Sequence, residues 1–358
     1  MPTIDVGGVE KNFILISNFL SQNLEKVTIV TTSYKFKNVF KNNIKFVSLK
    51  NKNIEILPRR IKFLIGLILL FLEIVKNKNN LVFSFQANFY CIILCKLLGT
   101  KVIIRSNSSP TGWSNNLIKK KLYKYTLSLS DIVLANSIKF KNVLKKEFGI
   151  KATFIYNPLN SKEIIKKSKK KINNIFFSNK TINFINVARL EDQKDHITLI
   201  KAFAGLNKST KFKLLIIGDG RNKKKLNRMI IKYRLNNLIK IIGFKKNPYP
   251  YIKHSDVFIL SSIFEGLPNV LLEALALNKF IISSNCPTGP SEILDNGKGG
   301  LLFKMKNSDD LRDKILFYLK NKKKCFKKFK HAKKRLIRFD YIKNMNKYLE
   351  IVNSNRLK

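Results

Sequence analysis

The feature that most constrains the fold is a regular alternation along the chain between short β-branched runs and longer amphipathic stretches. Short runs of this kind predict strands and the longer stretches predict helices, so the chain consists of strand–helix–strand units. Such units form parallel sheets covered by helices on both faces. The predicted strands are 26–31, 44–48, 81–85, 101–105, 131–135 and 152–156, followed by 182–187, 213–218, 239–242, 256–260, 280–283 and 301–303.

Twelve strands are too many for one compact sheet, so the 358 residues are predicted to form two Rossmann-like domains. The boundary is best placed in YNPLNSKE, 156–163, because Asn157-Pro158 is a turn signal. The lysine-rich stretch from there to Lys180 has no strand character and is predicted to be solvated. The expected parts are an N-terminal domain at 1–158, a C-terminal domain at 159–335, and a helical segment at 336–358 that packs back on the N-terminal domain.

The chain is strongly basic, because 70 Lys and Arg against 22 Asp and Glu give a formal net charge of +48. Such a surface attracts polyanions: nucleic acid, anionic lipid or phosphate-bearing substrates. A nucleic-acid-binding protein would concentrate this charge in an arm or a recognition element. Here lysines are spread through both predicted domains without any nucleic-acid-binding signature, so no specific nucleic-acid partner is expected.

Cysteine and histidine give no sign of a metal site. The four cysteines contain no CxxC pair and the three histidines form no cluster, which indicates a reducing compartment and no zinc or disulfide framework. The first residues, MPTIDVGGVEKN, lack the apolar core of a signal peptide. The longest apolar run, 63–72, is too short to span a bilayer. We therefore expect a cytoplasmic protein.

The most informative segment is SSIFEGLPNVLLEALAL, 261–277, in which a loop with Glu265 leads into a helix near Pro268. Glu273 is the only charged residue in that otherwise apolar helix, and a lone buried carboxylate is costly. Two carboxylates beside the N–H groups of a helix N-terminus suit the hydroxyls and phosphates of a sugar nucleotide. The alternative is that Glu273 is solvated and Glu265 caps the helix.

Three other loops follow predicted strands or open helices. VARLEDQKDH, 187–196, carries Arg189 and Lys194, two cations that can clamp a diphosphate; the alternative is a basic surface loop. The turn at Gly218 and Asp219 in IIGDG is a weaker signal for a base or a phosphate. GGVEKN, 7–12, opens the first helix and offers N–H groups to an anion.

The chain resembles glycosyltransferase family 4 (group 1), of the type that builds bacterial surface polysaccharides. The resemblance rests on five segments in this order and spacing: GGVE, VARLEDQK, IIGDG, FEGLPNVLLE and NGKGGLLF. The resemblance covers essentially the whole chain and is most specific in its C-terminal half. It implies the α/β GT-B architecture, two Rossmann-like domains facing a central cleft. It also implies a retaining hexosyl- or N-acetylhexosaminyl-type transferase (EC 2.4) with a nucleotide-sugar donor, UDP-sugar being favoured and GDP-sugar the alternative. No metal or other cofactor is implied, and the chain has no Asp-x-Asp motif.

The resemblance also implies roles for single residues. Arg189 and Lys194 would bind the donor diphosphate, and Glu265 would hold the donor sugar; these three are the expected catalytic residues. Glu273 would hold the ribose, and the leaving diphosphate itself would assist attack from the same face. The other expected donor-binding residues are Gly266, Leu267, Pro268, Asn269, Gly7, Gly8, Gly218 and Asp219. Relatives carry a histidine near the acceptor where this chain has RSN, so Arg105 and Asn107 are expected to make acceptor-side contacts. Relatives also begin with an apolar strand, so the first strand is expected to be missing.

The segment PRRIKFLIGLILLFLEIVKNK, 58–78, is apolar with basic flanks and is either buried in the N-terminal domain or placed at a membrane interface. We predict burial, because a Rossmann-like helix is normally half covered by its sheet. Lysines elsewhere, as in 115–125, still favour an anionic membrane surface, each basic residue contributing about 1 kcal/mol. The expected protein is a peripheral enzyme on the inner face of the cytoplasmic membrane. It would act on a lipid-linked or oligosaccharide acceptor in lipopolysaccharide or capsule synthesis. The alternative is a basic nucleic-acid- or membrane-binding protein with a catalytically inactive GT-B fold.

Overall fold

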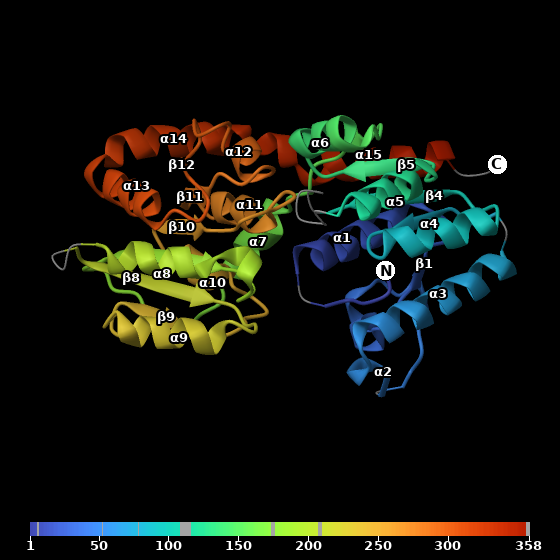
Figure 1. Ribbon diagram of the computed structural model, residues 1–358, viewed down its shortest axis with the longest axis horizontal. Helices are drawn as coiled ribbons and strands as arrows, with labels where there is room; N and C mark the ends of the chain where they lie inside the picture. Colours follow the sequence, from blue (N-terminus) through green and yellow to red (C-terminus); the bar gives the residue numbers. More distant parts are fainter. Residues whose placement is uncertain are drawn as a thin grey trace. The chain divides into compact units, whose positions relative to one another are not determined.

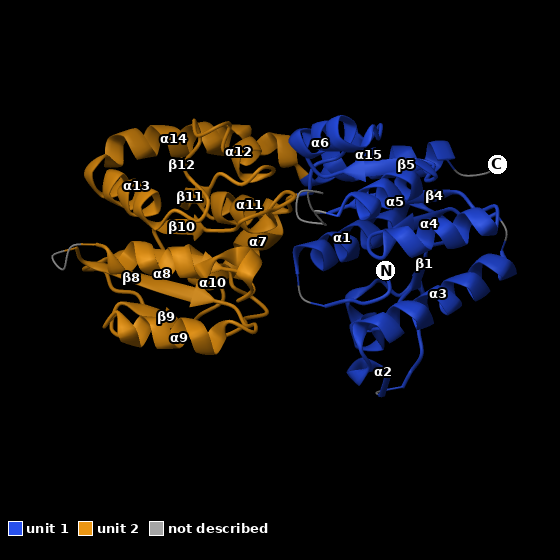
Figure 2. Cartoon of the chain, in the orientation of Figure 1, with its two compact units in different colours: residues 1–158, 341–358 blue, residues 159–340 orange. Residues whose placement is uncertain are grey.

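We analysed a computed structural model of the chain, which describes residues 1–5, 7–51, 53–77, 79–107, 116–172, 176–206 and 210–355. The chain divides into two compact units (Figure 2). Unit 1 comprises residues 1–158 and 341–358, and unit 2 comprises residues 159–340. Each unit contains parallel β-sheet with helices packed against it (Figure 1). Residues 336–340 thus belong to unit 2, and the final helix belongs to unit 1.

Unit 2 is built on a six-stranded parallel sheet with the order β12-β11-β10-β7-β8-β9. Its strands are β7 (Ile182–Val187), β8 (Phe212–Ile217), β9 (Ile239–Ile241), β10 (Val257–Leu260), β11 (Phe280–Ser284) and β12 (Leu301–Phe303). Counted within the unit, this is the doubly wound order 6-5-4-1-2-3. The winding therefore reverses between β7 and β10, and in such sheets ligands bind beyond the carboxyl ends of the strands at this switch point.

Helices cover the sheet of unit 2, and its core consists of strand residues such as Phe184, Leu214 and Ile259, all completely buried. The helices are α7 (Ser161–Ser168), α8 (His196–Ala204), α9 (Lys223–Lys232), α10 (Tyr249–Lys253), α11 (Asn269–Ala276), α12 (Pro290–Ile293), α13 (Ser308–Lys320) and α14 (Lys322–Arg335), with 3-10 turns η3 (Asp192–Lys194) and η4 (Leu336–Phe339). Helix α11 contacts β10, β11 and helices on several sides, which explains why its sequence is apolar almost all round.

The stretch after the domain boundary is not simply solvated, contrary to the sequence-based prediction. It contains α7, which packs against α10 and α11. Ile164 and Ser168, four residues apart on one helical face, are buried, while the lysines lie on the opposite face. At the end of the unit, Leu159 donates its N–H to the Phe339 carbonyl (2.8 Å), so the first and last residues of unit 2 are joined.

Unit 1 contains a four-stranded parallel sheet, β3-β4-β5-β6, and a parallel pair, β1-β2. Its strands are β1 (Thr28–Val30), β2 (Lys45–Val47), β3 (Val82–Ser84), β4 (Val102–Ser106), β5 (Ile132–Ala135) and β6 (Thr153–Phe154). All twelve predicted strands are therefore confirmed, because the twelve strands among the described residues coincide with them to within about two residues at each end.

Residues 1–5 form no strand, yet they are built into unit 1. The Thr32 N–H donates to the Pro2 carbonyl (2.8 Å) just beyond β1, and Thr3 Oγ1 donates to Gln86 Oε1 (3.1 Å) just beyond β3. Ile4 is completely buried in the core that surrounds α1. The segment thus connects the β1-β2 pair with the four-stranded sheet.

The helices of unit 1 include one from the end of the chain. They are α1 (Gly8–Asn23), α2 (Asn53–Ile56), α3 (Arg59–Lys76), α4 (Asn88–Leu97), α5 (Leu117–Ser128), α6 (Ile138–Phe148) and α15 (Tyr341–Asn355), with the 3-10 helix η1 (Tyr34–Val39). Helix α15 contacts α1, and its Met345, Tyr348 and Val352 are buried in the same core as Ile4.

The predicted burial of the apolar segment 58–78 is wrong. The segment forms α3, in which only Gly66, Glu73 and Ile74 are buried. Six of its twelve large apolar side chains are exposed, and five more are only half-buried. None of the helices in the described part of the chain is long and apolar enough to cross a membrane.

Candidate functional site

The candidate site lies at the carboxyl edge of the unit 2 sheet, where the loops after β7 and β10 meet. The two strands pair directly, with Val257 opposite Phe184. The loop after β7 carries Arg189 and Lys194, and the loop after β10 carries Glu265. The strand order therefore brings together, at the switch point, residues that are about 70 positions apart in the sequence.

Hydrogen bonds to backbone carbonyls hold these two loops against each other. The Ile263 N–H donates to the Gln193 carbonyl and Gln193 Nε2 donates to the Phe264 carbonyl, both at 2.8 Å. Ser261 Oγ donates to the Lys194 carbonyl at 2.7 Å. The two loops are thus joined by uncharged hydrogen bonds as well as by their charged side chains. Sequence reasoning missed Gln193, whose role depends on a contact with a distant loop and leaves no local signal.

Lys194 and Glu265 form an ion pair, with Lys194 Nζ 2.5 Å from Glu265 Oε1. Their side chains are only 15% and 10% exposed, so the pair is largely removed from water and the hydrogen bond is charge-assisted. Among the described residues, none donates a hydrogen bond to the second oxygen, Glu265 Oε2. The alternative that Glu265 caps α11 is wrong, because its carboxylate pairs with Lys194 and not with the helix.

Arg189 differs from Lys194 in being exposed. Within the described part of the chain, its guanidinium forms no hydrogen bond or ion pair. Its loop is nevertheless fixed, since the Leu190 N–H donates to the Asp219 carbonyl (2.9 Å) and the Asn222 N–H to the Leu190 carbonyl (3.0 Å). The alternative of a basic surface loop accounts for the exposure of Arg189. It does not account for the ion pair of Lys194, which is largely removed from water.

The loop after β8 supports the Arg189 loop from the other side. A Cβ at Gly218 would lie 1.8 Å from the Ala188 carbonyl oxygen, so only glycine lets the two main chains approach this closely. Asp219 is exposed, and the N–H of Gly220, followed by Lys223, lowers the pKa of its carboxyl. Gly218 therefore shapes the loop, while Asp219 presents a carboxylate to solvent.

The segment 266–269 is braced by the loop after β11. Thr288 Oγ1 donates to the Glu265 carbonyl, and a Cβ at Gly289 would lie 2.5 Å from the Gly266 carbonyl oxygen. Gly266, Leu267 and Pro268 are buried, whereas Asn269 is half-buried at the start of α11. Thr288 lies in the Gly/Pro-rich stretch CPTGP, which is typical of a loop but does not reveal this contact.

Glu273 is the fifth residue of α11 and is 7% exposed. The alternative that it is a solvated helix residue is therefore wrong. Because α11 follows β10 directly, the positive end of its dipole lies at the same edge of the sheet as Lys194.

A buried histidine stands next to the site and was not predicted from the sequence. His196, 2% exposed, begins α8, and its Nε2 lies 3.0 Å from Asn186 Oδ1, while Asn186 Nδ2 donates to the Ile259 carbonyl (2.8 Å). Burial lowers the pKa of His196 to about 3, and the charge of Lys194 acts in the same direction. His196 is therefore neutral at physiological pH and links α8 to Asn186, which in turn ties β7 to β10.

The remaining predicted residues belong to unit 1. Gly7 is the N-cap of α1 and Gly8 is its first residue. Arg105 is 1% exposed; its guanidinium donates to Tyr348 Oη (3.0 Å), to Asn157 Oδ1 (2.5 Å) and to Asn107 Oδ1. The polar groups of Arg105 and Asn107 thus have partners within unit 1, where they link β4 to α15.

Comparison with known proteins identifies the family. Residues 167–335 match the family model described as glycosyl transferases group 1. An uncharacterized glycosyltransferase of Methanocaldococcus jannaschii is 30% identical over 305 residues, which cover 80% of this chain and 68% of that protein. This chain belongs to the group 1 glycosyl transferases. The matched region of this glycosyltransferase contains every predicted site residue of unit 2.

Two further relatives are informative. The N-acetylgalactosamine-N,N'-diacetylbacillosaminyl-diphospho-undecaprenol 4-alpha-N-acetylgalactosaminyltransferase of Campylobacter jejuni is 29% identical, covering 71% of this chain and 70% of that protein. The crystal structure of Anabaena HepE in complex with UDP has a TM-score of 0.76 at 17% identity and covers 98% of both chains. This second likeness shows the fold, and the predicted GT-B architecture of the glycosyltransferase is confirmed.

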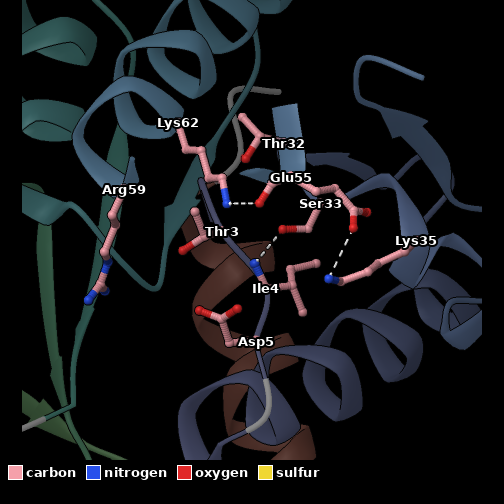
Figure 3. Close-up of a pocket in the computed structure, with 9 residues that line it drawn as sticks. All are labelled: Thr3, Ile4, Asp5, Thr32, Ser33, Lys35, Glu55, Arg59 and Lys62. Carbon is pink, nitrogen blue, oxygen red and sulfur yellow. Dashed lines mark hydrogen bonds and ion pairs between the residues drawn. The ribbon is translucent and has the colours of Figure 1, made fainter. Parts of the chain in front are cut away.

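Unit 1 of the glycosyltransferase also contains a polar hollow of about 140 Å³, shown in Figure 3. Residues 3–5, the segment after β1 and the start of α3 enclose it. Lys35 Nζ pairs with Glu55 Oε2 (3.1 Å) and Lys62 Nζ donates to the Glu55 carbonyl (2.6 Å). Its lining residues are Thr3, Ile4, Asp5, Thr32, Ser33, Lys35, Glu55, Arg59 and Lys62. A hollow with hydroxyls, cations and carboxylates can hold a polyhydroxylated or anionic group.

Within the described ranges, no three His, Cys, Asp or Glu side chains come together in a way that could hold a metal ion. The four cysteines are buried and unpaired.

Proposed function

We propose that the protein transfers a sugar from a nucleotide-sugar donor to a lipid-linked or oligosaccharide acceptor with retention of configuration, UDP-sugar being the favoured donor and GDP-sugar the alternative. The observation that carries the proposal is the Lys194–Glu265 pair, which is held at the switch point of unit 2 in the loop that also carries the exposed guanidinium of Arg189. A basic protein without catalysis would have no need to bury and brace such a pair.

Each residue has a role that follows from its chemistry. Arg189 and Lys194 bind the donor diphosphate, Arg189 through its planar fork and Lys194 as a point charge. Glu265 Oε2 accepts a hydrogen bond from a hydroxyl of the donor sugar, and Glu273 holds the ribose. The main chain at Gly266–Asn269, together with Gly218 and Asp219, contacts the remainder of the nucleotide. Gly7 and Gly8 contribute the N–H groups of a second helix N-terminus.

In the proposed reaction, the bond between the anomeric carbon and the diphosphate oxygen breaks, and the electron pair leaves with the diphosphate. Arg189 and Lys194 stabilise the negative charge that develops there. The acceptor hydroxyl forms the new bond on the same face, and its proton passes to the leaving phosphate oxygen. No metal ion takes part in this proposal, because two fixed cations already face the diphosphate.

The acceptor is proposed from a relative. The C. jejuni enzyme is named for a diphospho-undecaprenol-linked acceptor and for N-acetylgalactosamine transfer. We propose a comparable lipid-linked saccharide here, used at the inner face of the cytoplasmic membrane in the synthesis of a surface polysaccharide such as lipopolysaccharide or capsule. The hollow in unit 1, with Lys35, Arg59 and Lys62, is the proposed place for its polar groups.

Calorimetric titration with UDP and with GDP, in EDTA and at about 0.15 M and 0.5 M salt, tests this function. We expect base-selective binding that survives both EDTA and salt. Arg189→Gln should weaken it by roughly 10- to 100-fold, since one charge-assisted hydrogen bond contributes about 1.5–3 kcal/mol. Arg228→Gln, an exposed arginine on α9, is the matched control and should change nothing.

Binding that ignores the base, fades with salt and responds equally to Arg189→Gln and Arg228→Gln would contradict the proposal. It would instead support the alternative of a basic polyanion-binding protein, because nonspecific phosphate binding weakens steeply with salt. Retention is checked separately, by the anomeric configuration of the product in NMR spectra.

A further inference from the structure

One face of α3 in unit 1 is apolar and exposed along the whole helix. Six large apolar side chains on it are 40% to 60% exposed: Ile61, Leu64, Ile68, Phe71, Leu72 and Val75. At 3.6 residues per turn, all six fall within an arc of about 100°. Arg60 and Lys76, both exposed, border this arc at the two ends of the helix. We call the six residues the α3 stripe.

The orientation of the stripe is fixed from the opposite side. Glu73 lies on the covered face and pairs with Lys45 of β2, with Lys45 Nζ 2.7 Å from Glu73 Oε1. Gly66 contacts Pro2 so closely that an added Cβ would lie 3.1 Å from the Pro2 side chain. Because these contacts use the inner face, the apolar stripe faces outward as a property of the folded unit.

The neighbouring helices also expose apolar side chains. Helix α4 lies between α3 and α5 (Figure 1). Tyr90 (54%) and Leu97 (79%) of α4 are exposed, as are Ile118 (77%) and Leu122 (50%) of α5. Together α3, α4 and α5 contain nine lysines and arginines and a single acidic residue, the buried and paired Glu73. The surface is thus apolar and cationic, without acidic residues of its own.

This chemistry favours a bilayer over a protein partner. Protein interfaces are depleted in lysine, whereas the exposed lysines of α5 lie among its apolar side chains. A second copy is disfavoured, since each chain carries a net charge of +48. A helix that presents an apolar face with basic borders instead lies in the plane of an anionic membrane, with its apolar side chains at the headgroup boundary.

We propose that the surface of α3, α4 and α5 docks the protein on a bilayer of anionic phospholipid, with the α3 stripe inserted and the basic residues against the headgroups. The proposal concerns unit 1 and does not depend on the donor site of unit 2.

Sedimentation with vesicles of phosphatidylcholine alone, or with about one-third phosphatidylglycerol, tests the docking. We expect binding to the anionic vesicles at least tenfold tighter than to the neutral ones, weakening with salt. Leu64→Ser/Ile68→Ser should weaken it at least tenfold. The matched control is Ile231→Ser/Ile337→Ser, which changes two exposed isoleucines of unit 2 (62% and 74%) and should leave binding unchanged. The circular dichroism spectrum and the thermal unfolding transition of both variants should match those of the wild type, which shows that both units are folded.

Insertion is measured with a fluorescent label on Leu64→Cys, because the four native cysteines are buried and should not compete for the label. Spin-labelled lipid should quench this label, and should not quench the same label on Ile231→Cys. Equal quenching at both positions, or equal loss of binding in the two double-serine variants, would overturn the proposal. Self-association of the free protein that Leu64→Ser/Ile68→Ser abolishes, without vesicle binding, would also overturn it, in favour of a second copy.

Discussion

Removing the positive charge at Lys194 should destabilise unit 2 and, separately, abolish donor binding. In Lys194→Met the apolar stem remains, but the carboxylate of Glu265, in a side chain 10% exposed, loses the ammonium 2.5 Å away. At an effective dielectric constant of about 20, two unit charges at this distance attract by about 6–7 kcal/mol, most of which offsets the cost of removing both from water. We expect a loss of about 3 kcal/mol in the free energy of unfolding, within the range for breaking one side of a buried pair.

A double-mutant cycle measures the coupling energy between Lys194 and Glu265 separately from the other contacts of each residue. Glu265→Gln leaves Lys194 without its partner, and Lys194→Met/Glu265→Gln removes both charges at once. The double variant should lose less stability than the two single losses added, by about 2 kcal/mol, because neither charge remains buried alone. Differential scanning calorimetry and urea unfolding followed by circular dichroism provide these values.

The double variant should separate the effect on stability from the effect on donor binding. Its stability is partly restored, but calorimetric titration should detect no UDP binding, because Lys194, the proposed contact to the diphosphate, is missing. A coupling energy below about 0.5 kcal/mol would refute the reasoning about the buried pair. Normal UDP affinity in the double variant would refute the assignment of these residues to the donor.

Three other predictions concern residues around and beyond the site. Because burial lowers the pKa of His196 to about 3 in the folded state, only the unfolded state takes up this proton between about pH 6.5 and 3. The contribution of neutral His196 to the free energy of unfolding is therefore complete above pH 6.5 and falls by about 1.4 kcal/mol per pH unit below that pH. In urea titrations between pH 7 and 5, the wild-type protein should lose about 2 kcal/mol more of this free energy than His196→Gln. Gly218→Ala should reduce UDP affinity at least tenfold, because its Cβ would collide with the Ala188 carbonyl. Gly205→Ala is the control and should leave UDP affinity nearly unchanged, because the nearest contact of its Cβ is 3.3 Å away on a flexible arginine. Arg105→Met removes the guanidinium that donates to Asn157 and Tyr348 and should lower the calorimetric stability of unit 1 by about 2 kcal/mol; an unchanged transition would contradict the structural role.

The strands were predictable because a strand in a parallel sheet is a short, continuous apolar run, and this signal is local. The position of Glu265 on a loop at a strand end was predictable for the same reason. Its partner was not, since the contact with Lys194 depends on β7 and β10 being neighbours in the sheet. Gln193 and Thr288 act by donating to distant carbonyls, a role that any polar side chain in a loop could have.

The error at α3 has a different origin. Its composition indicates how much apolar surface the helix has, but not how much of that surface the sheet covers. The covering contacts involve Pro2 and Lys45, neither of which is part of the helix, so no pattern within 58–78 could reveal them. The same reasoning applies to α7, where a lysine-rich sequence concealed the buried Ile164.

The course of the chain through unit 1 affects the order in which the protein can be made. Unit 2, residues 159–340, interrupts unit 1, whose core is closed by Met345 and Tyr348 of α15. During synthesis the first 158 residues therefore leave the ribosome without the helix that completes them, whereas unit 2 emerges as one uninterrupted segment. The usual order, in which the N-terminal domain folds first, is thus reversed here. Synthesis of unit 1 starts before that of unit 2, but unit 1 can complete its core only after unit 2 has been synthesised.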